Sequence, residues 1–125
     1  MKYFPLQNII ALHDAMIETM QGLKGIEPSR IVYLESALNH IQNDDFYPLF
    51  VDKLTHLFFA CIQFHPFLDG NKRTALLVAK LFIELNLPNH LSFDFYQQLE
   101  NVAVAVADGK MNKEELKHFF KKILG

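Results

Sequence analysis

The chain has 125 residues, a formal net charge of −2 and a sequence pI of about 6.3. Half of its residues are hydrophobic and 12 are phenylalanine, which is enough apolar surface for the core of a single domain spanning residues 1–125. Surfaces that bind nucleic acid usually carry an excess of basic residues, so the overall charge argues against direct nucleic-acid binding.

Export and membrane insertion are not expected. The N-terminus lacks a continuous apolar segment with a small-residue cleavage site, and no apolar run reaches the roughly 20 residues that span a bilayer. The single cysteine, Cys61, lies in an apolar run and cannot close an internal disulfide. We therefore expect a cytoplasmic protein and no membrane partner.

Hydrophobic spacing predicts an all-α bundle of about six helices. The segment 49–64 is apolar nearly all round, which places its helix at the centre of the bundle. Asn112 and Glu115 have the spacing of a capping box at the start of the last helix. The expected helices cover roughly residues 6–21, 28–41, 49–64, 70–87, 92–107 and 112–123.

Two polar segments allow alternative interpretations. His13, Asp14 and Glu18 fall in the first expected helix, and we interpret them as a solvated face because too few ligands accompany them for a metal site. Residues 39–48 are rich in turn formers and predict a surface loop or a short β-hairpin. The alternative is an ordinary helix connection with Phe46 and Tyr47 packed into the core.

The segment His-Pro-Phe-Leu-Asp-Gly-Asn-Lys-Arg at residues 65–73 directly precedes an apolar helix. The His65 imidazole can accept a proton near neutral pH, which suits the deprotonation of an attacking hydroxyl group. Asp69 supplies the one carboxylate of the segment, and Mg²⁺ that binds with nucleotide phosphates commonly takes just one or two protein carboxylates. We predict His65 as the catalytic base and Asp69 as the metal ligand, with helix capping as an alternative role for Asp69.

The next four residues predict a phosphate-binding site at the start of that helix. Gly70 permits a turn and close approach of backbone N–H groups, and Asn71 can donate from its side chain. Lys72 and Arg73 add positive charge that suits phosphate oxygens. Two cations at a helix start oppose the helix dipole, and such local conflicts concentrate at functional sites.

This segment resembles the signature of the Fic/Doc family, His-Pro-Phe-x-Asp/Glu-Gly-Asn-Gly/Lys-Arg, and is close to that of the Doc branch of death-on-curing toxins. Gly25, the run 34–38 and residues 104–116 look like flanking features of Doc-type chains. The resemblance implies a Fic/Doc helical bundle that uses Mg²⁺ and ATP. It also implies that the 39–48 region, with Phe46 and Tyr47, is a flap that docks an extended stretch of the target protein by strand addition.

Two positions depart from the AMP-transferring members of that family. Lys72 stands where they usually have glycine, and Leu76 stands where they usually have a second arginine. The resemblance to the Doc branch therefore implies a protein kinase that transfers the ATP γ-phosphate to a serine or threonine. Gly70 stands where the type member of the Doc branch has alanine, which keeps AMP transfer (AMPylation) as the alternative.

The Doc resemblance further implies a toxin of a toxin–antitoxin pair that arrests translation, with elongation factor Tu as the expected target. The chain lacks a Ser/Thr-x-x-x-Glu-Gly/Asn segment, the self-inhibitory motif of many relatives, so we expect a separate antitoxin protein to restrain it. A catalytically silent interaction module with the same fold is the rival from another class. The intact His65, Asp69, Asn71 and Arg73 argue against that rival.

Overall fold

The computed structural model describes residues 1–88 and 93–124, and these residues are predominantly helical. The predicted all-α fold of six helices is confirmed for them, with helix ends that differ from the expected ranges by up to three residues; residue 92, the expected start of the fifth helix, lies outside the described residues. None of these helices combines the length and the apolar character needed to cross a membrane, as far as the described residues go. The helices are α1 (Leu6–Met20), α2 (Ile31–His40), α3 (Phe50–Gln63), α4 (Asn71–Asn86), α5 (Phe93–Ala107) and α6 (Lys113–Leu124).

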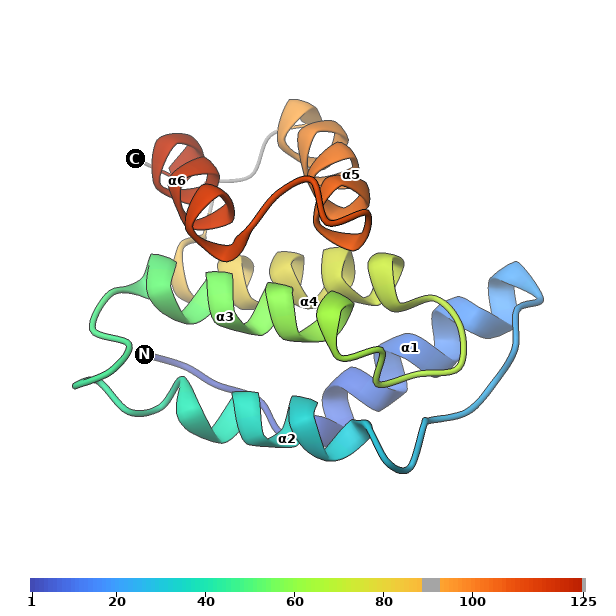
Figure 1. Ribbon diagram of the computed structural model, residues 1–125. Coiled ribbons are helices and arrows are strands. Elements are labelled where there is room, and N and C mark those ends of the chain that lie inside the picture. The colour runs from blue at the N-terminus through green and yellow to red at the C-terminus, as the bar shows by residue number, and fades with distance from the viewer. Residues whose placement is uncertain (89–92, 125) are drawn as a thin grey trace.

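The helices form three layers of two, with α3 and α4 in the middle layer (Figure 1). Helix α3 packs against α4 and also contacts α2, α5 and α6, while α4 contacts α1 and α5. Eight of the 14 residues of α3 are buried. The central position of α3 follows from its sequence, because a helix that is apolar nearly all round must be covered on every side.

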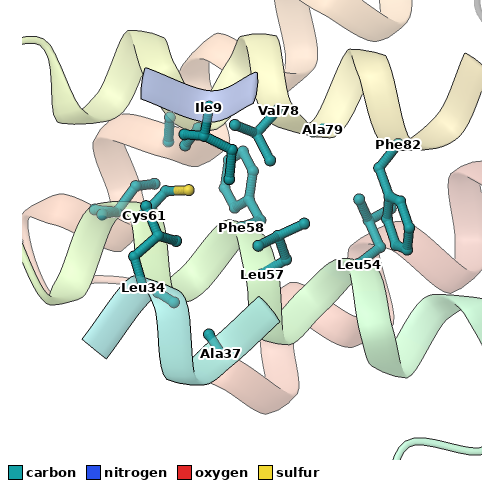
Figure 2. Packing of buried hydrophobic residues seen from close by; sticks show 14 of the residues in the cluster. Ile9, Leu34, Ala37, Leu54, Leu57, Phe58, Cys61, Val78, Ala79 and Phe82 are labelled. Atoms are coloured by element: carbon teal, nitrogen blue, oxygen red, sulfur yellow. The ribbon is translucent and has the colours of Figure 1, made fainter. Parts of the chain in front are cut away.

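The hydrophobic core lies between these layers. Figure 2 shows Phe58 of α3 reaching toward Ile9 of α1 and Val78 of α4, and all three side chains are fully buried. Cys61 lies in the same cluster, and burial raises the pKa of its thiol to about 12. Because the thiolate is the reactive form of cysteine, Cys61 is a packing residue and not a nucleophile.

The predicted capping box opens α6 as expected. The Asn112 N–H donates to Glu115 Oε1 at 3.0 Å, and the Glu115 N–H donates to Asn112 Oδ1 at 2.8 Å. One turn into the helix, Lys117 Nζ lies 2.6 Å from the Asp52 carboxylate of α3. These contacts fix the start of α6 against the central layer.

The connection between α2 and α3 is a surface loop, and no part of residues 41–49 forms a β-hairpin. Phe46 is 77% exposed, so its packing into the core is also a wrong prediction, whereas Tyr47 is half-buried against the His56 ring. The fully buried Lys53 anchors the loop, because its Nζ donates to Asp44 Oδ1 at 2.7 Å. The turn-forming residues indicated a loop, but they could not show whether it forms a β-hairpin or an irregular connection that Lys53 anchors.

The burial of His56 between α3 and α6 predicts sensitivity to acid. Burial, with smaller effects from the charges on Lys113 and His40, lowers the pKa of His56 from 6.5 to about 4. The unfolded chain therefore takes up a proton at His56 near pH 6.5, and the folded chain does so only near pH 4. The free energy of unfolding should fall as the pH decreases through that window. Between pH 7.5 and pH 4.5 we expect the free energy of unfolding to fall less in His56→Gln than in the parent. Urea denaturation at both pH values measures this difference.

The exposed His118 offers the matched control, since His118→Gln removes an imidazole that is not buried. Parent-like acid destabilisation in both variants would show that His56 does not cause it.

Candidate active site

An open cleft of about 560 Å³ lies beside the connection between α3 and α4. Helix α5 contributes four of its lining residues, and Met20 of α1 and Leu76 of α4 also line it. The structure thus brings together the residues predicted for catalysis, phosphate binding and metal binding. Those residues are His65, Asp69, Gly70, Asn71, Lys72 and Arg73.

Residues 64–70, which we call the motif loop, hold His65 in a strained conformation. The backbone φ of His65 is 48°, in the left-handed region that costs a residue with a side chain roughly 1–2 kcal/mol. The next residue, Pro66, is buried, and the side chain of His65 is exposed at the cleft. Strained residues that the surrounding structure holds in place are concentrated at functional sites, which supports a functional role for His65.

The segment 25–27 lies beside the motif loop and forms an antiparallel β-bridge with it. The Glu27 N–H donates to the Pro66 carbonyl at 2.8 Å, and the Leu68 N–H donates to the Gly25 carbonyl at 3.1 Å. Gly25 has a φ of 121°, a conformation that side chains disfavour. The connection between α1 and α2 therefore supports the motif loop directly.

The predicted target-docking flap, residues 39–48, is not the segment that lies beside the motif loop. Phe46 and Tyr47 precede α3, and the motif loop follows α3, so they lie at opposite ends of that helix (Figure 1). A helix of 14 residues is about 21 Å long at 1.5 Å per residue. The extended backbone beside the motif loop belongs to the segment 25–27. The composition of residues 39–48 indicated a turn, but it could not show which connection between helices packs against the motif loop.

The Asn71 side chain braces the motif loop. Its Oδ1 accepts a hydrogen bond from the Phe67 N–H, and its Nδ2 donates to the Phe67 carbonyl, each at 3.0 Å. One of the two Nδ2 hydrogens is therefore committed to the loop, and donation of the other to a bound anion stays a prediction. The backbone N–H groups at the start of α4 remain for that task, because the first turn of a helix has no intrahelical acceptors for them.

His13 of α1 is a second brace, and the sequence analysis did not find it. Its ring is fully buried and stacks on Phe67, with centroids 3.8 Å apart and an angle of 10° between the planes. His13 Nε2 lies 2.8 Å from the Asp69 carbonyl oxygen. The interpretation of His13 as part of a solvated face is thus wrong. Its spacing of four residues from the buried Ile9 and Ile17 was the available signal.

The Asp69 carboxylate points toward the chain that follows α1. Its Oδ1 accepts from the Gly70 N–H at 2.8 Å and its Oδ2 from the Leu23 N–H at 3.1 Å. Each oxygen keeps lone-pair capacity for a further ligand. Within residues 1–88 and 93–124 no group of three or more His, Cys, Asp or Glu residues could hold a metal. This donor set fits an ion such as Mg²⁺ that binds together with phosphate oxygens.

The start of α4 is positively charged. Lys72 and Arg73 are exposed in its first turn, and the ion pairs found among the described residues involve neither of them. Their charges add to the positive end of the helix dipole at the cleft. Glu100 of α5 also lines the cleft, and nothing in the sequence indicated this, because α5 is remote from residues 65–73 along the chain.

Two comparisons with known proteins found similar sequences. Residues 3–83, which include α1 to α3, the motif loop and most of α4, match the model of the Fic/DOC family. The chain is also similar to "Protein kinase doc" of Escherichia phage P1. The two are 31% identical over 130 residues, which cover 100% of this chain and 98% of the phage protein.

The Asn71 brace predicts that Asn71→Ala loosens the motif loop. Both main-chain groups of Phe67 would lose their partners, at a cost of about 1–3 kcal/mol for a buried polar group left unsatisfied. We expect the amides of His65 and of residues 67–70 to exchange with deuterium at least tenfold faster. Asn101→Ala, at an exposed position of α5, is the control. Unchanged exchange in the Asn71 variant would show that the loop holds its shape by other means.

Proposed function

The chain belongs to the Fic/Doc family, and on that premise we propose that it transfers the γ-phosphoryl group of Mg²⁺-ATP to a serine or threonine of another protein. The observation that carries the proposal is that His65 lines the same cleft as the cationic start of α4. An imidazole beside a phosphate-binding helix terminus supplies both a base and charge stabilisation.

Each part of this arrangement has a role in the proposed reaction. His65 accepts the proton of the incoming hydroxyl as its oxygen attacks the γ-phosphorus, and the bond from that phosphorus to the β–γ bridging oxygen breaks, so that ADP leaves with the electron pair. The N–H groups at the start of α4, with Lys72 and Arg73, stabilise the phosphate charge. Asp69 would hold Mg²⁺ together with phosphate oxygens, and the bound ion would neutralise part of their charge.

The side chain at position 76 favours phosphoryl transfer over AMP transfer. Leu76 lines the cleft at the position where AMP-transferring relatives usually have an arginine. An apolar side chain cannot clamp a phosphate at that place, which supports binding of the nucleotide with its γ-phosphate toward His65. AMP transfer remains the second candidate, because Gly70 departs from the alanine of the Doc type member.

The proposal includes protein partners. The similar phage protein is named a protein kinase, and the Doc resemblance supports a toxin that phosphorylates elongation factor Tu and arrests translation. An antitoxin acting in trans is the proposed restraint. The exposed side chains of Met20, Leu68 and Val104 give the cleft an apolar lining that a segment of such a protein would cover.

We place the docking edge for the target at Ile26 instead of at Phe46. Residues alternate in direction along an extended strand, and Gly25 and Glu27 already use the groups that face the motif loop. The N–H and C=O of Ile26 then face the other way, and no hydrogen bond to either is found in the described part of the chain. An added strand of target protein would pair with them beside His65.

Labelled ATP tests the reaction. Incubation of the chain with target protein and ATP labelled on the γ-phosphorus should transfer label, and ATP labelled on the α-phosphorus should not. His65→Ala should lower the transfer rate roughly 100-fold or more, because general base catalysis contributes at least that much. Transfer from the α-position would establish AMP transfer instead, and no transfer from either label would favour the silent interaction module.

The docking edge is tested by two variants in different connections. Ile26→Pro removes the N–H that would pair with an added strand, and should lower the rate of target modification at least tenfold while Mg²⁺-ATP binding persists. Phe46→Ser alters the loop at the far end of α3 and should leave the rate within about twofold of the parent. If Phe46→Ser lowers the rate of target modification more than Ile26→Pro does, the docking role belongs to Phe46 and Tyr47.

A further inference from the structure

His13 contacts the motif loop in two ways that have no part in the proton transfer proposed for His65. Its ring stacks on Phe67, and its Nε2 lies 2.8 Å from the Asp69 carbonyl oxygen. The other ring nitrogen, Nδ1, lies 3.2 Å from the exposed Asp14 carboxylate. The Asp69 carbonyl is an acceptor only, so Nε2 carries the hydrogen and donates it. The ring is fully buried, which makes the loss of this hydrogen bond costly.

The bond to Asp69 fixes the direction of a second group. The peptide between Asp69 and Gly70 is trans, so its C=O and N–H point in opposite directions. With the carbonyl directed at His13 in the interior, the Gly70 N–H is directed away from His13. It donates to Oδ1 of the Asp69 carboxylate at 2.8 Å, and both Asp69 and Gly70 are lining residues of the cleft.

Gly70 itself does not select this direction. A rotation of the peptide by half a turn changes the sign of φ at Gly70, now 77°, and glycine accepts both signs. A larger residue is disfavoured at this position, because a Cβ would lie 2.8 Å from Met16 Cε of α1. Gly70 therefore permits the tight turn, but contacts from neighbouring residues must determine the orientation of the Asp69–Gly70 peptide.

We propose that His13 is a positioning residue, which holds the Asp69–Gly70 peptide so that its N–H, and not its carbonyl oxygen, faces the anion-binding part of the cleft. In the rotated state a carbonyl dipole would present negative charge to a phosphate group. The inference rests on the proposed function in one respect, since it takes phosphate to be the ligand of the cleft.

Two substitutions separate the hydrogen bond from the ring. His13→Phe keeps an aromatic ring that can stack on Phe67 but has no donor, whereas His13→Gln keeps a donor and loses the ring. His56→Phe is the matched control, because it removes a half-buried histidine ring at the interface of α3 and α6. Three-bond couplings between the Gly70 amide proton and its two α-protons report the sign of φ, and with it the direction of the N–H, in the free protein. Titration with Mg²⁺ and inorganic tripolyphosphate reports anion affinity.

We expect His13→Phe to change the Gly70 N–H coupling and to weaken tripolyphosphate binding roughly tenfold. His13→Gln should recover part of both properties. His56→Phe should have parent-like values of both. A parental coupling and parental affinity in His13→Phe would overturn the inference. If His13→Phe does not fold, a parental coupling and parental affinity in His13→Leu, which also lacks a donor, would overturn it. The coupling is measured without nucleotide, so it decides the role of His13 even if the parent transfers no label from ATP.

Discussion

The cleft proposed as the active site depends on hydrogen bonds that satisfy the backbone of the motif loop from outside the loop. Buried backbone N–H and C=O groups need partners, and a loop between two buried helices has few of its own. Asn71 supplies both partners of Phe67, Glu27 pairs with the Pro66 carbonyl, and His13 binds the Asp69 carbonyl. These partners come from α4, from the connection before α2 and from α1. The conformation of seven residues is thus determined by three separate parts of the chain.

This support explains how the loop can break local rules at the proposed site of the reaction. His65 has a positive φ, and Lys72 and Arg73 lie at the wrong end of a helix for their charge. Both features cost stability, and both are useful for a site that presents an imidazole and binds a phosphate. Helices α3 and α4 offset such costs, because they contribute many fully buried apolar side chains to the core. The packing of α3 and α4 thus stabilises the fold enough to tolerate strain in the motif loop that connects them.

The helices were predictable because apolar residues recur at helical spacing, and the contiguity of residues 65–73 guaranteed that the site residues lie close together. What the sequence did not contain was the identity of the residues that contact them. His13 lies on the buried face defined by Ile9 and Ile17, yet an isolated histidine beside an aspartate resembles a solvated pair until Phe67 is placed against it. Asn71 likewise has a side chain suited to an anion, and only the loop conformation shows that it also binds both main-chain groups of Phe67. The wall formed by α5 and the pairing of segment 25–27 depend on tertiary packing between distant segments.

The account requires that a triphosphate bind at the motif loop with its terminal phosphorus next to His65. A crystal structure of the chain with Mg²⁺ and a non-hydrolysable ATP analogue measures this directly. We predict that the phosphates contact the backbone N–H groups at the start of α4, and that the γ-phosphorus is the one nearest the His65 imidazole. A nucleotide whose phosphates lie outside the cleft, away from both His65 and the start of α4, would contradict the account.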